Sequence, residues 1–152
     1  MKADKTKSAP QLVPAIERAA HLLGLYLERQ TGTLELTQAE AHVLARLLRA
    51  GSTSPSELHR LFGHKRSTLT GILDRLEARG YLIRELNADD RRSVIVSLTG
   101  EGKKVAEKVA LIIEALERQI AARLSQHDLN GFFSLLEVLE AETAGDSPPP
   151  AI

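Results

Sequence analysis

Apolar residues recur at helical spacing along the stretch HKRSTLTGILDRLEARG, which runs from His64 to Gly80. The stripe that would anchor such a helix on a core consists of Leu69, Ile72, Leu73 and Leu76. The opposite face carries small or polar side chains and includes Gly71, and a glycine inside a helix costs roughly 1 kcal/mol relative to alanine. This pattern favours a helix whose outer face is approached closely by another molecule, although an ordinary amphipathic surface helix shares the same spacing.

Three more helices are predicted ahead of this stretch. The first has apolar residues at helical spacing from Leu12 to about Gln30. The second begins at Thr37, where Glu40 completes a capping box three residues later, and it ends at Gly51. The third begins in Ser54-Pro55-Ser56-Glu57, which combines the same box with a proline at the first helical position. The residues of this third helix that are expected to face inward are Leu58, Leu61 and Phe62.

The third helix and the stretch after it form a helix-turn-helix pattern, because only Gly63 and His64 separate them. After Gly80 the apolar period changes from about 3.6 to about 2 residues, which predicts strands at Tyr81–Leu86 and Ser93–Leu98. The polar loop between them, residues 87–92, makes the pair a hairpin wing. Adjacent arginines at its tip suit a narrow minor groove, whereas a solvated turn with internal ion pairs is the alternative.

Two long apolar helices are predicted after the wing. Thr99 is expected to cap the first, which continues to about Ser125, and the residues from Ser125 to Asp128 could cap the second. The second helix has so wide an apolar arc that more than one partner surface is needed to cover it. Its apolar residues are Leu129, Phe132, Phe133, Leu135, Leu136, Val138 and Leu139. The sequence thus predicts a mainly α fold with a small β wing (α+β), in which a winged helix-turn-helix domain is flanked by long N- and C-terminal helices.

Composition narrows the function. Of the 152 residues 43% are hydrophobic and 26% are charged, so the chain is expected to fold. Cysteine is absent, which excludes disulfides, thiolate zinc sites and thiol redox sensing. No common enzyme motif occurs and the histidines are scattered, so we expect no enzyme, no metal site and no cofactor. No run of about 18 apolar residues is present, which predicts a soluble cytoplasmic protein without a membrane segment.

The charge is zero overall but unevenly distributed. Residues 57–104 hold ten Lys and Arg against seven Asp and Glu, whereas residues 105–152 hold three against eight. A basic middle beside an acidic C-terminal third indicates that the middle meets phosphates while the end does something else.

Together these motifs resemble the MarR family of bacterial winged helix-turn-helix transcriptional regulators. The resemblance spans roughly residues 12 to 140, and its most specific parts are DRLEARG followed by a strand and DDRRS ahead of SVIVSLT. It implies a homodimer, formed by the first helix and the last two, that binds pseudopalindromic double-stranded DNA and usually represses transcription. Many members release DNA on binding small phenolic or other ligands, so the resemblance also allows for a small-molecule effector.

Pattern and resemblance divide the chain into five expected parts. These are a disordered basic arm (1–10), an N-terminal dimerisation helix (11–32), a winged helix-turn-helix DNA-binding domain (33–98), C-terminal dimerisation helices (99–143) and a disordered Pro-rich tail (144–152).

The resemblance also assigns candidate site residues. Its helix contacts with DNA fall on Arg66, Ser67, Thr68, Thr70 and Arg75, and its wing contacts on Asp90, Arg91 and Arg92. The predicted DNA-binding set is completed by Ser54, Ser56, Lys65 and Gly71. At Gly71 the chain departs from many members, which carry a basic or larger polar residue there. A ligand pocket is expected between the first helix and the winged domain, with candidate contacts from His21, Tyr26 and His42.

A second interpretation of the function stays open at this point. The chain could be a dimeric winged-helix scaffold for protein interactions that does not bind an operator. The zero net charge and Gly71 are the features that support it.

Overall fold

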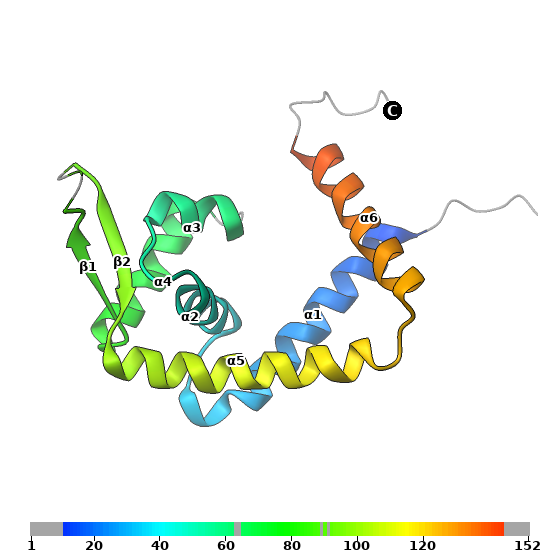
Figure 1. Ribbon diagram of the computed structural model, residues 1–152, viewed down its shortest axis with the longest axis horizontal. Coiled ribbons are helices and arrows are strands. Elements are labelled where there is room, and N and C mark those ends of the chain that lie inside the picture. Colours follow the sequence, from blue (N-terminus) through cyan, green and yellow to red (C-terminus); the bar gives the residue numbers. More distant parts are fainter. Residues whose placement is uncertain (1–10, 63–64, 89, 91, 145–152) are drawn as a thin grey trace, which may run out of the picture. The chain divides into compact units, whose positions relative to one another are not determined.

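The computed structural model describes residues 11–62, 65–88, 90 and 92–144, and within them it contains six α-helices, a short 3-10 helix and one two-stranded hairpin (Figure 1). The elements in chain order are α1 (Leu12–Gln30), η1 (Gly32–Leu34), α2 (Gln38–Ala50), α3 (Pro55–Phe62), α4 (Arg66–Ala78), β1 (Leu82–Leu86), β2 (Val94–Leu98), α5 (Gly100–Ala121) and α6 (Gln126–Thr143). The mainly α fold with a small β wing is therefore confirmed. The predicted arm (1–10), the predicted tail apart from Ala144, and the turn residues Gly63 and His64 lie outside the described residues.

Helix starts follow the predicted capping residues. Thr37 and Glu40 form a complete capping box at the start of α2, and Ser125 and Asp128 form another at the start of α6. At the start of α5 the backbone N–H of Gly102 donates to the Thr99 hydroxyl at 3.0 Å. Local sequence alone therefore determines these three helix starts, although α5 ends at Ala121, a few residues before the predicted end.

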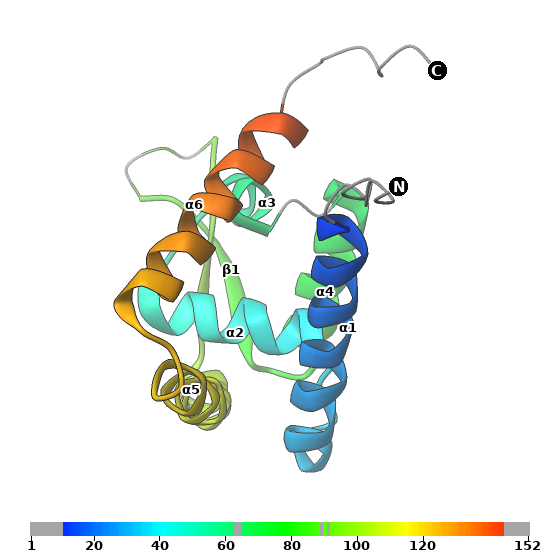
Figure 2. The same cartoon turned by 90° about the vertical axis from the view of Figure 1, so that its right-hand side faces the viewer.

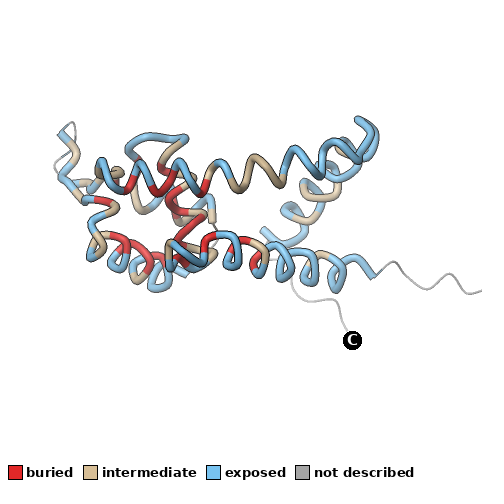
Figure 3. Tube along the Cα trace, turned by 90° about the horizontal axis from the view of Figure 1, so that it is seen from below, coloured by how far each residue is buried: buried red, intermediate tan, exposed pale blue. Residues whose placement is uncertain are grey.

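The chain divides within α5 into two compact units, the first ending at Ile112 and the second beginning at Ile113. In the first unit α2 lies at the centre, where it contacts α1, α4 and β2 (Figure 2). Its core is aliphatic, and the buried stretches are red in Figure 3. The largest fully buried apolar side chains are Leu27, Leu44, Leu47, Leu58, Ile72, Leu73, Leu76, Leu82, Val43, Val96 and Val109.

The predicted inward face of α3 is only partly correct. Leu58 is fully buried, but Leu61 is 44% exposed and Phe62 is half-buried. Periodicity identifies which side of a helix is apolar, but it does not show how far along that helix the covering core extends. In this two-turn helix the core covers Leu58 and leaves much of Leu61 open to solvent.

The wing is an antiparallel hairpin that is joined to the start of α3. Leu82 pairs with Leu98 and Leu86 with Val94, so each strand begins one residue later than predicted and ends at the predicted residue. Thr53 and Val96 exchange backbone hydrogen bonds of 3.0 and 2.7 Å, so the segment before α3 pairs with β2. The hairpin is thereby held against the helix-turn-helix by backbone as well as by side chains.

The first turn of α5 closes against the base of the wing. The Thr99 hydroxyl donates to the Gly80 carbonyl at 2.6 Å, and Gly102 lies so close to the Tyr81 backbone that a Cβ would collide with it. Val105 and Val109 then continue into the core of the first unit. The first half of α5 is thus part of that core.

The second unit contains the end of α5 and all of α6, and it buries little within one chain. No residue of α6 is buried, and Phe132 and Phe133 are 52% and 58% exposed. Their rings meet edge to face with centroids 5.6 Å apart. No helix in the described part of the chain is long and apolar enough to cross a membrane.

Candidate nucleic-acid interface

The geometry of α4 separates an anchoring face from an outer face. The predicted stripe of Leu69, Ile72, Leu73 and Leu76 is buried, as expected from its spacing. The outer side of the helix and its entry are exposed, and the predicted contact residues Lys65, Arg66, Ser67, Thr68, Thr70 and Arg75 all lie there, together with Asp74 and Ala78. A polar, basic helix surface on a rigid apolar anchor is what insertion into a DNA groove requires.

Gly71 is not required by packing within the described chain. A Cβ built at this position would have one neighbour within 4 Å, the Nη1 atom of Arg75 at 3.6 Å, which is an ordinary van der Waals distance. The helix could therefore accept a side chain here, so the cost of a mid-helix glycine is not explained by the fold. Thr70, next to it, donates its hydroxyl to the Arg66 carbonyl at 2.9 Å.

Arg75 is held by a buried carboxylate that sequence reasoning did not place in the site. Its Nε donates to Glu40 Oε1 at 2.7 Å, and the side chains are 56% and 4% exposed, respectively. The other carboxylate oxygen of Glu40 accepts from the backbone N–H of Thr37 at 3.0 Å. Burial by itself raises the pKa of Glu40, but hydrogen bonds from Arg75 and Thr37, together with the Arg75 charge, bring this pKa below its usual value.

The predicted residues at the start of α3 differ in role. The Ser54 hydroxyl accepts from the backbone N–H of Glu57 at 3.1 Å and is therefore a helix cap. Ser56 is exposed, and it lines a shallow hollow between α3 and α4. The hollow is lined by Pro55, Ser56, His59, Arg66, Leu69, Thr70 and Leu73.

Arg84 joins the wing to α4, a link that sequence reasoning missed. From β1 its Nη1 donates to Glu77 Oε2 and its Nη2 to Asp74 Oδ1, each at 2.7 Å. Asp74 and Glu77 are three residues apart on α4, and this spacing is the signal that could have pointed to a shared cation. The hairpin is therefore oriented relative to the helix by a two-pronged ion pair.

Arg79 makes a second link that the sequence did not predict. Its guanidinium donates to the carbonyls of Leu34 and Glu35, each at 2.7 Å, and lies 5.0 Å from the centroid of the Tyr81 ring. The segment that follows α1 is thus fastened to the end of α4.

At the wing tip, Asp90 Oδ1 accepts from the backbone N–H of Arg92 at 3.0 Å, and the side chain of Arg92 is exposed. This bond is a local turn contact, which orders the backbone beneath Arg92. Arg91 and the neighbouring Asp89 lie outside the described residues.

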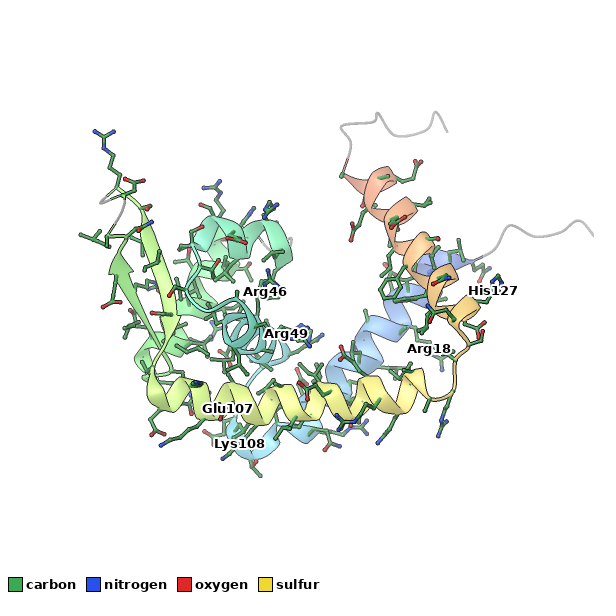
Figure 4. The ribbon with its side chains drawn as sticks, viewed as in Figure 1. Arg18, Arg46, Arg49, Glu107, Lys108 and His127 are labelled. Atoms are coloured by element: carbon green, nitrogen blue, oxygen red, sulfur yellow. The ribbon has the colours of Figure 1, made fainter. Side chains whose placement is uncertain are left out.

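The candidate ligand contacts lie on two helices that touch each other. His21 is exposed and Tyr26 half-buried on α1, while His42 is half-buried on α2. Arg46 lies one turn after His42, and its Nε is buried with no hydrogen-bond partner in the described structure. Figure 4 shows Arg46 and Arg49 on α2. Within the ranges described, no three His, Asp or Glu side chains gather in a way that could hold a metal ion.

Comparison with known proteins decides the family. The model of the MarR family matches residues 36–94, which span α2 through the start of β2. The HTH-type transcriptional regulator PecS of Dickeya dadantii is 32% identical over 132 residues, covering 85% of this chain and 80% of that protein. The chain belongs to the MarR family of transcriptional regulators. The repressor MdtR of Bacillus subtilis is 33% identical, with 81% of this chain and 82% of that protein covered.

Solved MarR structures have the same winged helix-turn-helix fold. Wild-type MarR from E. coli in its apo form is 25% identical and has a TM-score of 0.67, with 86% of this chain and 98% of that chain covered. A mutant MarR from E. coli complexed with operator DNA is also 25% identical and has a TM-score of 0.71, with 83% and 91% covered. The resemblance to the MarR family drawn from the sequence is confirmed.

Proposed function

We propose that this MarR-family protein is a sequence-specific regulator of the repressor type that binds a pseudopalindromic operator as a homodimer. The observation that carries the proposal is the outer face of α4, which is exposed and polar and has no side chain at its centre because of Gly71. Arg84 fixes the wing beside that face, so helix and hairpin present one surface to DNA. The MarR of E. coli, which has been solved on operator DNA, supports this mode of binding.

The predicted contacts fall into two kinds. Base edges in the major groove would be read by Ser67, Thr70 and Arg75, which lie along the outer side of α4. Phosphates or the minor groove would be contacted by Lys65, Arg66 and the wing arginines, which supply charge. Ser56 borders the same surface, whereas Ser54 supports it as the cap of α3.

The homodimer is supported by the apolar surface of the outer helices. Leu12 and Val13 of α1, Leu111 of α5 and Val138 of α6 are each at least 46% exposed in the single chain. Exposed apolar surface on this scale marks an interface in a stable protein. A two-fold dimer with one α4 per subunit would place its half-sites about 10 bp apart.

The test begins with duplexes selected from a random library by binding to the full-length chain, followed by footprinting. We expect an inverted repeat whose affinity falls steeply when about 5 bp are inserted between the half-sites, because half a turn places them on opposite sides of the duplex. A protein that yields no sequence-dependent complex in the presence of competitor DNA would be a dimeric scaffold. An asymmetric footprint would also contradict the proposal.

An effector site on α1 and α2 is a further part of the proposed function. The Nε of Arg46, which has no hydrogen-bond partner in the described structure, supports an acidic small molecule, since a carboxylate or phenolate could accept its hydrogen bond. His42 lies one turn before Arg46 on α2, and His21 and Tyr26 lie on α1, which contacts α2. Titration with benzoate should then raise the melting temperature of the wild type, and the Arg46→Gln variant should lose that increase.

We further propose that the protein acts in the cytoplasm, where its operator lies, and has no catalytic role.

A further inference from the structure

Glu40 has a role in the proposed DNA interface although it lies on α2. Its side chain is 4% exposed, and both of its oxygens are engaged, one by Arg75 and one by the Thr37 backbone. A carboxylate fixed at both ends cannot follow a moving arginine, so it holds the arginine in one position. Support of this kind around a contacting side chain reduces the freedom that is lost when a ligand binds.

The bond to Glu40 leaves Arg75 with one defined edge for DNA. A guanidinium carries five N–H donors in a planar fork, and here Nε is already bonded to Glu40 at 2.7 Å. A base can then be bound in bidentate fashion only through the Nη1 and Nη2 edge. The pair of acceptors that matches this edge in the major groove is O6 and N7 of guanine.

Gly71 adds an independent observation at the same place. Arg75 follows Gly71 by one helical turn, and its Nη1 lies 3.6 Å from where a Cβ of residue 71 would be. The Nη edge therefore lies over the one position of the outer face that has no side chain. A base approaching this edge needs the same space.

We propose that Glu40 is a positioning residue that holds Arg75 for end-on recognition of one guanine in each half-site, and that Gly71 leaves room for that guanine. The inference rests on the proposed function, and it names a specificity determinant from outside the helix-turn-helix. The carboxylate of Glu40 touches no DNA and acts through Arg75.

The first experiment replaces each guanine of the selected operator, one at a time, by 7-deazaguanine, which lacks the N7 acceptor. With the wild-type chain, one position per half-site should reduce the affinity by about fivefold or somewhat more, toward the lower end of the range for a bidentate base contact, because O6 still accepts. Arg75→Ala, which has no side-chain donor, should bind the unmodified operator more weakly and should be indifferent to that substitution. A scan in which no guanine is sensitive, or in which Arg75→Ala keeps the same sensitivity, overturns the inference.

The second experiment tests Glu40 itself with Glu40→Gln. We expect discrimination at the sensitive guanine to fall by about 3- to 10-fold while affinity for random DNA is retained, because the charge of Arg75 remains. Thr37→Ala is the matched control, since it weakens the same capping box but leaves the carboxylate that holds Arg75 in place. Equal reductions in the two variants would assign the effect to the helix start and contradict the inference.

Two further variants test the role of Glu40 and Gly71 even if Glu40→Gln folds poorly. In the Arg75→Ala background, Glu40→Gln should not reduce discrimination any further, since a positioning residue acts through its partner. Gly71→Leu adds a helix-favouring side chain whose Cβ would meet no atom closer than Arg75 Nη1 at 3.6 Å, and it should reduce affinity at the same guanine. Additive effects, or an unchanged Gly71→Leu, would overturn the inference. A wild type that selects no operator contradicts the proposed function instead.

Discussion

The two compact units of the chain use apolar residues in opposite ways. Up to Ile112 the apolar stripes of α2, α4 and β2 are covered by one another, and every fully buried aliphatic side chain of the described structure lies at or before Val109. From Ile113 onward α6 is richer in leucine and phenylalanine than α2 or α4, but none of its residues is buried. The same kind of sequence pattern therefore completes a core in one unit and leaves a surface in the other.

The apolar residues of the first unit pack against other elements of the same chain, whereas those of α6 need a partner to cover them. Leaving large apolar side chains in water forgoes about 1.5–3 kcal/mol each. Phe132, Phe133 and Val138 are each more than half exposed in the single chain, and the second copy in the proposed homodimer would cover them. The first unit is expected to tolerate loss of that partner better than the second.

The largest effect should come from placing charge on α6. The double variant Phe132→Glu/Phe133→Glu should weaken dimerisation by about a thousand-fold or more. The reason is that carboxylates would replace the rings that both subunits bury in the proposed dimer interface. Light scattering should then report a monomer at micromolar concentration, with specific DNA binding abolished. The double variant Gln126→Glu/Asn130→Glu, which adds the same charge at polar positions of α6, is the control and should stay dimeric.

A second effect distinguishes covered from uncovered residues inside the first unit. Leu58→Ala should lower the free energy of unfolding by about 2–5 kcal/mol, since Leu58 is fully buried. Leu61→Ala, one turn later and 44% exposed, should cost less than about 1 kcal/mol. Urea denaturation at a single protein concentration measures both. Equal costs would mean that Leu61 is covered in the dimer and that the first unit also depends on the partner.

The wing should affect DNA binding without affecting assembly. Arg92→Ala or Arg91→Ala should weaken binding to operator and random DNA alike, by about tenfold at moderate salt, because each variant leaves DNA phosphates without a neutralising cation. The slope of log affinity against log salt should become shallower by about one unit for each phosphate that is no longer neutralised. Titrations at several salt concentrations check this, with sizing as the control for the dimer. An unchanged slope in both variants would place the wing away from DNA.

The smallest effect concerns acid. The folded-state pKa of Glu40 is lowered, so its ionised form stabilises the fold at neutral pH, and this contribution is lost as the pH falls through that folded value. The wild type should melt at a higher temperature than Glu40→Gln at neutral pH. This difference should shrink as the pH falls below the ordinary pKa of glutamate. Thermal melts across this range test the sign. A difference in melting temperature between the two proteins that grows as the pH falls would mean that Glu40 is protonated in the folded protein.

Local patterns in the sequence were enough to predict the fold but only part of the candidate site. The bounds of α1 and the capping boxes at Thr37 and Ser125 follow from neighbouring residues, and they agree with the structure. The pair formed by Glu40 and Arg75 joins residues 35 positions apart. Neither capping rules nor helical periodicity connects such positions, so the buried support of the interface became visible only with the fold.

The same limit applies to the end of the first unit. The sequence predicts that Thr99 caps α5, and the structure agrees. Caps and periodicity do not show that the first turns of this helix belong with the wing, because that depends on Gly102 lying against the Tyr81 backbone. Close approach of distant backbone segments has no local signal, and the domain boundaries expected from the sequence remain a prediction.

The burial of Val105 and Val109 in the first unit also has a consequence for the order of biosynthesis. A ribosome adds about 5–20 residues per second, and domains fold from the N-terminus as they emerge. The wing hairpin is complete at Leu98, but the core beneath it stays open until Val109 has emerged, roughly a second later at that rate. The nascent chain thus exposes Leu82 and Val96 for that interval, and the winged body closes only after the first half of α5 has left the ribosome.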